Sequence, residues 1–203
     1  MSGKTGAYGS IAAPTVIGGK PLPLPILATL KNGTLVQVVQ VPSAPDAATV
    51  SRLQTLLNYE IRAGDTYPFE TEMDEVEFRS YFLSASAFMV ADAKDPSIIL
   101  GTFYVKPNYP GRCSHICNGG FLTAPEYRGQ GVGKIMAKAF LVVAPLLGYK
   151  ASVFNLVFES NVASVELWRG LGFKEIGRVP KAGRLHGSDK LVDAIVFHYD
   201  FEN

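Results

Sequence analysis

The fold is constrained most strongly by a glycine-rich segment at residues 127–134 (Tyr-Arg-Gly-Gln-Gly-Val-Gly-Lys). An apolar run precedes it at 116–122, and apolar residues at helical spacing follow it from Val132 to Val143. With a further apolar run at 151–158, this order predicts a parallel, right-handed crossover. The turn should leave backbone N–H groups unpaired at a helix start, where partial positive charge favours a phosphate.

Counting excludes two common glycine motifs. A P-loop would need Gly at position 128 and Ser or Thr at position 135, which are Arg128 and Ile135. The dinucleotide fingerprint would need a third glycine where Lys134 stands. A Gly-Lys-Thr triplet at residues 3–5 follows no strand or glycine loop, so we discard it. The remaining alternatives are a phosphate-binding loop and a glycine turn that only starts a helix.

The pattern Arg128-x-x-Gly131-x-Gly133 resembles the pyrophosphate loop of the GCN5-related N-acetyltransferases (GNATs), which bind acetyl-CoA. The segment 161–173, with its Asn and terminal Gly-Phe, is similar to a second GNAT motif. The resemblance implies an α/β fold whose mixed sheet has two splayed parallel strands and flanking helices. It assigns the cofactor-binding role to Phe121, Leu122, Thr123, Arg128, Gly129, Gln130, Gly131, Val132, Gly133, Lys134 and Asn161.

Longer strings within residues 50–200 are similar to the yeast N-acetyltransferases that detoxify the proline analogue azetidine-2-carboxylate. That similarity implies a small cyclic amino acid as acceptor: azetidine-2-carboxylate, cis-4-hydroxyproline, or pyrroline-5-carboxylate or its open form. It implies direct acetyl transfer in a ternary complex. The implied substrate-binding residues are Tyr67, Phe69, Asn118, Asn155 and Leu156, and the implied catalytic residues are Asn118, Asn155 and Asn161.

Two positions depart from the usual GNAT pattern. Trp168 stands where the family's proton-donating Tyr is common, and indole is no useful acid. The first parallel strand also lacks a basic Glu. Asn118 and Asn155 lie mid-strand among apolar residues, where a buried amide is costly unless it is used. Asn161 is equally well explained as a helix N-cap.

Composition limits the remaining function classes. The chain has 203 residues, a net charge of +1 and 47% hydrophobic residues, which favours a globular protein without a nucleic-acid or membrane surface and, by default, a cytoplasmic one. Cys113, His115 and Cys117 alternate, so a strand would place them on one face, where they could not enclose a tetrahedral ion; we expect no metal. The basic group between residues 181 and 190 is expected in a solvated loop.

We expect a flexible arm at residues 1–30 and one GNAT domain at 31–203. Strands are predicted at 35–41, 87–92, 98–105, 116–122, 151–158, 173–179 and 193–201, and helices at 45–64, 74–83, 132–148 and 161–172, with a kink or a restarted turn at Pro145. The family resemblance also implies that two copies of the chain form a homodimer. Two functions remain as alternatives: acetylation of a peptide or protein amine, and non-catalytic acyl-CoA binding by a regulator.

Overall fold

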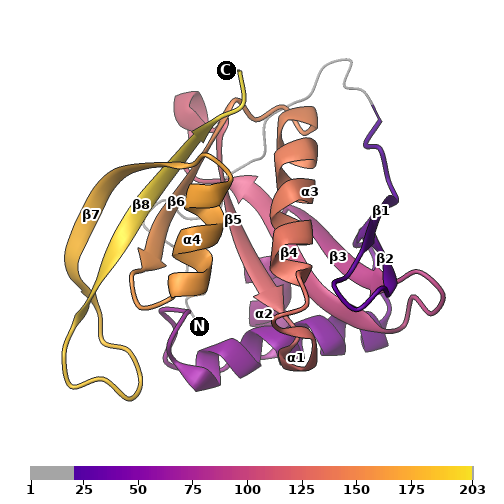
Figure 1. The fold of residues 1–203 in the computed structure, drawn as a ribbon, viewed down its shortest axis with the longest axis horizontal. Coiled ribbons are helices and arrows are strands. Elements are labelled where there is room, and N and C mark those ends of the chain that lie inside the picture. The colour runs from indigo at the N-terminus through magenta and orange to yellow at the C-terminus, as the bar shows by residue number, and fades with distance from the viewer. Residues whose placement is uncertain (1–20, 203) are drawn as a thin grey trace.

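The computed structural model describes residues 21–202, which form one eight-stranded sheet in the order β1-β2-β3-β4-β5-β6-β8-β7 (Figure 1). Only β5 and β6 are parallel, so the sheet is mixed. The predicted α/β fold is confirmed. The strands are β1 (Ile26–Thr29), β2 (Leu35–Gln40), β3 (Ser86–Asp92), β4 (Ile99–Pro107), β5 (Ile116–Thr123), β6 (Ala151–Phe158), β7 (Lys174–Gly183) and β8 (Val192–Asp200). The helices are α1 (Ala47–Ala63), α2 (Glu75–Phe82), α3 (Val132–Leu146) and α4 (Val162–Gly170).

Local capping explains where α1 and α2 begin and end. The Asp46 side chain accepts a hydrogen bond from the Thr49 backbone N–H at 2.7 Å, and Gly64 ends α1 in the left-handed region at φ 70°. A reciprocal capping box between Asp74 and Glu77 opens α2. These boundaries agree with the predicted ones because each depends on residues close together in the sequence.

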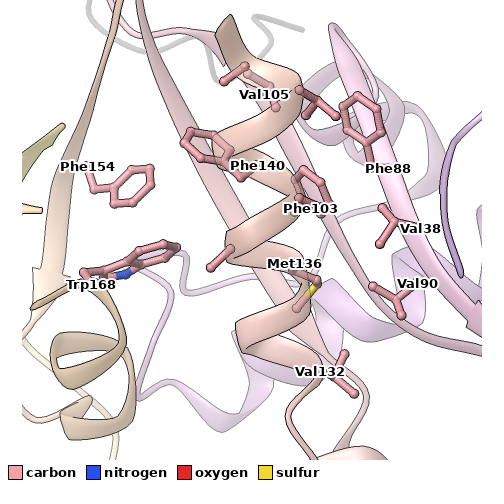
Figure 2. Packing of buried hydrophobic residues seen from close by; sticks show 14 of the residues in the cluster. Val38, Phe88, Val90, Phe103, Val105, Val132, Met136, Phe140, Phe154 and Trp168 are labelled. Carbon is pink, nitrogen blue, oxygen red and sulfur yellow. The ribbon is translucent and has the colours of Figure 1, made fainter. Parts of the chain in front are cut away.

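Two apolar cores cover the two faces of the sheet. In the larger one, α3 lays Val132, Met136 and Phe140 against Phe88 and Phe103 from β3 and β4 (Figure 2). Its apolar face recurs at helical spacing, which is why α3 buries a whole stripe against the sheet. The second core joins α1 and α2 to the opposite face. β5 contributes to both cores, with Cys117 in the larger one and Leu122 in the second.

The parallel strands β5 and β6 separate soon after they begin. They pair only at Ile116 with Ala151 and at Cys117 with Ser152. Further along, the pairing of β6 with β8 shifts register between Phe154 and Val157. The backbone edges of both strands are therefore left open beyond residues 117 and 152, as the expected splay requires.

The expected flexible arm is wrong over residues 26–30, and residues 1–20 lie outside the described part of the chain. Ile26 to Thr29 form β1, which pairs antiparallel with β2, and Leu30 is buried. Leu22 and Leu24 pack against the larger core. The Pro-rich composition hid a short edge strand whose partner lies only a few residues further along the chain.

Other boundaries also differ from the prediction. Cys113 ends a short 3-10 helix (Gly111–Cys113) and β5 starts at Ile116, so the expectation that Cys113, His115 and Cys117 share a strand face is wrong. α3 runs through Pro145 and ends at Leu146, since a proline in the last turn removes only one hydrogen bond. β7 is longer than predicted and takes residues 181–183 out of the expected loop.

Within residues 21–202, no helix has the length and apolar character needed to cross a membrane.

Candidate active site

A cavity of about 810 Å³ opens where β5 and β6 separate. One side is formed by the glycine loop and the first turn of α3, and the other by β6 and the start of α4. The connection between α1 and α2 closes one end with Asp65, Thr66 and Tyr67. Segments far apart in the sequence therefore meet around one space at the splayed strands.

The glycine loop has the geometry of an anion site. Gly129 and Gly131 take left-handed φ values of 75° and 98°, which other residues rarely adopt. No side chain caps the first turn of α3, so its N–H groups are available at the cavity. A Cβ on Gly133 would enter the space between Thr123 and Leu167, each 4.0 Å away. The loop keeps this space clear for a ligand.

Arg128 contributes less charge to this loop than the sequence indicates. Its guanidinium forms an ion pair with Glu60 of α1, a carboxylate that is almost fully buried. The other Glu60 oxygen accepts a hydrogen bond from Thr66 Oγ1 at 2.9 Å. Glu60 was missed as a site residue because helical periodicity places it among the core positions of α1.

A second element reaches the loop from the N-terminal hairpin. The Lys31 ammonium donates to the Gly129 carbonyl at 3.0 Å, and the Lys31 backbone N–H donates to the Gln130 carbonyl at 3.1 Å. The Asn32 amide donates to the Gln130 side chain at 3.0 Å. Lys31 also lines the cavity. No local sequence signal pointed to Lys31, which began the predicted domain and lay outside every predicted strand and helix.

The asparagines take different positions. Asn118 on β5 is half-buried and its Oδ1 accepts from the Gly119 N–H at 2.8 Å. Asn155 on β6 is exposed, and its amide exchanges two hydrogen bonds with Asn108. The expectation of a buried Asn155 amide is therefore wrong, because β6 has already left β5 at this point. Both residues line the cavity.

Asn161 caps α4 and also lines the cavity. Its Oδ1 accepts from the Ser164 N–H at 3.2 Å, while its Nδ2 donates to no protein group within residues 21–202. The two explanations offered by the sequence are thus compatible, since the cap uses the oxygen and leaves the amide hydrogens free.

Trp168 forms part of the cavity wall and of the core. It is 3% exposed, and its Nε1 donates to Ser164 Oγ at 2.9 Å. Its ring lies 4.9 Å from Phe121 and 4.6 Å from Phe154, measured between ring centroids. Trp168 therefore presents an apolar packing surface at the position where the family resemblance implied a proton-donating Tyr.

Most of the predicted site residues meet at this cavity. Those that line it are Tyr67, Asn118, Phe121, Thr123, Arg128, Gly129, Gly131, Val132, Gly133, Lys134, Asn155, Leu156 and Asn161. Three do not. The Leu122 side chain packs into the core below α1, Phe69 stands behind Tyr67 and contacts Tyr81, and the Gln130 side chain turns toward Asn32 and Glu126.

The two remaining clusters take no part in this cavity. Cys113 is exposed and Cys117 is buried, and within residues 21–202 no three His, Cys, Asp or Glu side chains are placed to hold a metal ion. In the connection after β7, Leu185 is buried, and the backbone N–H of the exposed His186 donates to the Gly64 carbonyl at 2.8 Å. That connection is therefore anchored to the end of α1 rather than fully solvated.

Comparison with known proteins places this site in a family. The acetyltransferase (GNAT) family profile matches residues 55–173, which include the glycine loop, both splayed strands and α4. The chain belongs to the GNAT family. It is 43% identical over 167 residues to the N-acetyltransferase aca1 of Schizosaccharomyces pombe, covering 75% of this chain and 80% of that protein. This GNAT protein is accordingly an N-acetyltransferase.

Solved GNAT structures share the fold. A GCN5-related N-acetyltransferase from Kribbella flavida superposes with a TM-score of 0.73 at 29% identity, covering 81% of this chain and 97% of that one. The putative acetyltransferase yncA from Salmonella typhimurium, solved with acetyl-CoA, superposes with a TM-score of 0.69 at 14% identity, covering 83% and 95%. At that identity the second likeness supports the fold alone.

Proposed function

We propose that this N-acetyltransferase uses acetyl-CoA to acetylate the amine of a small proline-like amino acid. The acceptors are azetidine-2-carboxylate and cis-4-hydroxyproline, whose ring nitrogen is a secondary amine, and pyrroline-5-carboxylate, which offers a primary amine in its open aldehyde form. The observation that supports this most directly is that one cavity is lined both by an uncapped glycine loop and by Asn118 and Tyr67. A phosphate-bearing donor and a compact acceptor fit its two ends.

The donor side fits acetyl-CoA. The uncapped first turn of α3 supplies N–H donors for the pyrophosphate, and the clear space at Gly133 admits it. Beyond residues 117 and 152 the open edges of β5 and β6 supply backbone groups that hydrogen-bond an amide chain as an added strand would. Phe121 and Thr123 lie along this path. The pantetheine arm thus ends beside Asn118 and Asn161.

The chemistry is direct transfer from the thioester to a neutral amine. Neither Cys113 nor Cys117 lines the cavity, so no described thiol is placed to take the acetyl group. The free Nδ2 of Asn161 can donate a hydrogen bond at the reacting centre, where negative charge develops on the carbonyl oxygen. Trp168 cannot supply a proton, so the proton that the attacking amine loses reaches the departing thiolate through water, through a tyrosine at the cavity, or after the thiolate has left unassisted. The proposed residues therefore orient and stabilise rather than exchange protons.

Thiol release from acetyl-CoA tests the proposal. We expect turnover with azetidine-2-carboxylate and cis-4-hydroxyproline, and weaker turnover with primary amines and peptides of similar size. Turnover only with peptide amines would favour acetylation of proteins. Tight acetyl-CoA binding without turnover of any amine would favour a regulator. Asn155→Ala should reduce acceptor discrimination more than acetyl-CoA affinity, and equal loss of both would place Asn155 elsewhere.

Homodimerisation stays a prediction. The long edge strand β7 exposes Ile176 and Val179, with 57% and 41% of their surfaces accessible. Light scattering after gel filtration measures the mass directly, and a charged residue at Ile176 should dissociate a dimer that uses this edge.

A further inference from the structure

The hydroxyl of Tyr67 is buried at the acceptor end of the cavity and has no hydrogen-bond partner within residues 21–202. It stands directly over β5, because a Cβ on Gly120 would lie only 2.8 Å from it. Buried hydroxyls are nearly always paired, since an unpaired one loses the hydrogen bond it makes in water. An orphan donor that faces a binding cavity therefore indicates a ligand.

Lys106 of β4 lies behind the same end of the cavity. Its Nζ is 4.0 Å and 4.2 Å from the ring centroids of Tyr81 and Tyr104, and it donates to the Tyr81 carbonyl at 3.1 Å. No carboxylate within residues 21–202 forms an ion pair with it. The half-buried charge is therefore offset only by two ring faces and one carbonyl, and it can attract an anion in the cavity beside those rings.

The other groups at this end are donors or engaged acids, apart from Asp65, an exposed carboxylate that also lines the cavity. Asn118 is the cross-strand partner of Lys106, and its Nδ2 donates to no protein group in the described residues. The hydroxyls of Tyr81 and Tyr104 bond each other at 3.2 Å. The buried acid Glu60 also lines the cavity, and both of its oxygens are occupied by Arg128 and Thr66.

We propose that Tyr67 and Lys106 recognise the carboxylate of the acceptor amino acid. The Tyr67 hydroxyl donates to it directly, and the Lys106 ammonium attracts it through the field of its unpaired charge. The inference rests on the proposed function and extends it, because it selects acceptors whose amine lies next to a carboxylate. Burial raises the pKa of Tyr67 well above its ordinary value, so the hydroxyl keeps its proton and remains a donor.

The test compares azetidine-2-carboxylate with azetidine, which has the same ring nitrogen without the carboxylate. Tyr67→Phe keeps the ring and removes only the hydroxyl. We expect this variant to lower kcat/KM for the acid about 10- to 100-fold more than for azetidine, as for loss of a hydrogen bond to a charged group. Lys106→Met should lower kcat/KM for the acid about 3- to 10-fold more than for azetidine. Lys106→Arg keeps the charge and should retain most of the wild-type preference for the acid.

Tyr81→Phe is the matched control, because it removes a hydroxyl that already has a protein partner. It should change the ratio of the two kcat/KM values by less than about 3-fold. The KM for acetyl-CoA should stay near its wild-type value in all four variants. Equal losses for the acid and for azetidine in Tyr67→Phe would overturn the proposal, since they would mean a general role in packing or catalysis.

A binding measurement separates this inference from the proposed function. Titration calorimetry with azetidine-2-carboxylate needs no turnover. Binding that is lost in Tyr67→Phe, without turnover by the wild type, would uphold carboxylate recognition and refute the acetylation proposal. Absence of binding to the wild-type protein saturated with CoA would refute the inference itself.

Discussion

Lys106 should make folding stability depend on pH in an unusual direction. Burial lowers the pKa of its ammonium from 10.5 to about 8 in the folded protein. Below about pH 8 both the folded and the unfolded chain hold the proton, and the folded state bears the full cost of burying the charge. Between about pH 8 and 10.5 only the unfolded chain keeps it, so the free energy of unfolding rises with pH.

The magnitude follows from the two pKa values. A fall from 10.5 to about 8 corresponds to about 3 kcal/mol of destabilisation at neutral pH. About 2 kcal/mol of this should be recovered between about pH 7 and 9.5. Lys106→Met removes the charge, so it should lose this rise. At about pH 7 the variant should be more stable by about 1–2 kcal/mol, after subtraction of the lost contact with the two tyrosine rings.

Urea unfolding followed by the fluorescence of Trp168, which is buried and the chain's single tryptophan, measures both quantities. The series should stop near pH 9.5 because burial also raises the pKa of Tyr67 and Tyr104, whose buried phenols lower stability at higher pH. Lys138→Met, which removes an exposed lysine on α3, is the control and should keep the wild-type slope. Parallel curves for the wild type and Lys106→Met would refute the reasoning.

Three further changes test other parts of the site. Gly120→Ala would place a Cβ 2.5 Å from the Tyr104 ring. It should lower the free energy of unfolding in urea by about 1–3 kcal/mol and weaken acceptor binding. An unchanged unfolding midpoint would contradict the close packing. Lys31→Ala should raise the KM for acetyl-CoA about 3- to 10-fold at low salt and less at high salt, whereas a salt-independent effect would exclude charge as the cause. Asn161→Asp keeps the capping oxygen, so the free energy of unfolding should stay within about 0.5 kcal/mol of the wild-type value. The variant loses the free Nδ2 and should turn over more slowly. Full activity would show that Asn161 acts only as a cap.

Sequence alone predicted what depends on neighbouring residues. Asp46, Gly64 and the Asp74–Glu77 box act within one helical turn, so the ends of α1 and α2 were close to the observed ones. The glycine loop was equally clear, since its spacing excludes a P-loop and a dinucleotide fingerprint, and the φ values of Gly129 and Gly131 favour glycine.

Contacts between distant segments were not predictable in this way. Lys31, Glu60 and Lys106 come from a turn, a helix and a strand that approach the cavity or its lining residues only after folding. Asn155 was expected to be buried because its neighbours are apolar, but β6 curves away from β5 and exposes it. Helical and strand periodicity report which face a residue occupies, not whether another element covers that face.

The Glu60–Arg128 ion pair has a kinetic consequence. Arg128 belongs to the loop that faces the donor, while Glu60 and its partner Thr66 border the acceptor end beside Tyr67. A pyrophosphate at the loop would share the guanidinium with Glu60, so donor binding would be coupled to the charge that the acceptor meets. Such coupling is reciprocal, and an acceptor must change donor affinity by the same factor. The KM for each substrate, measured at increasing concentrations of the other, gives that factor.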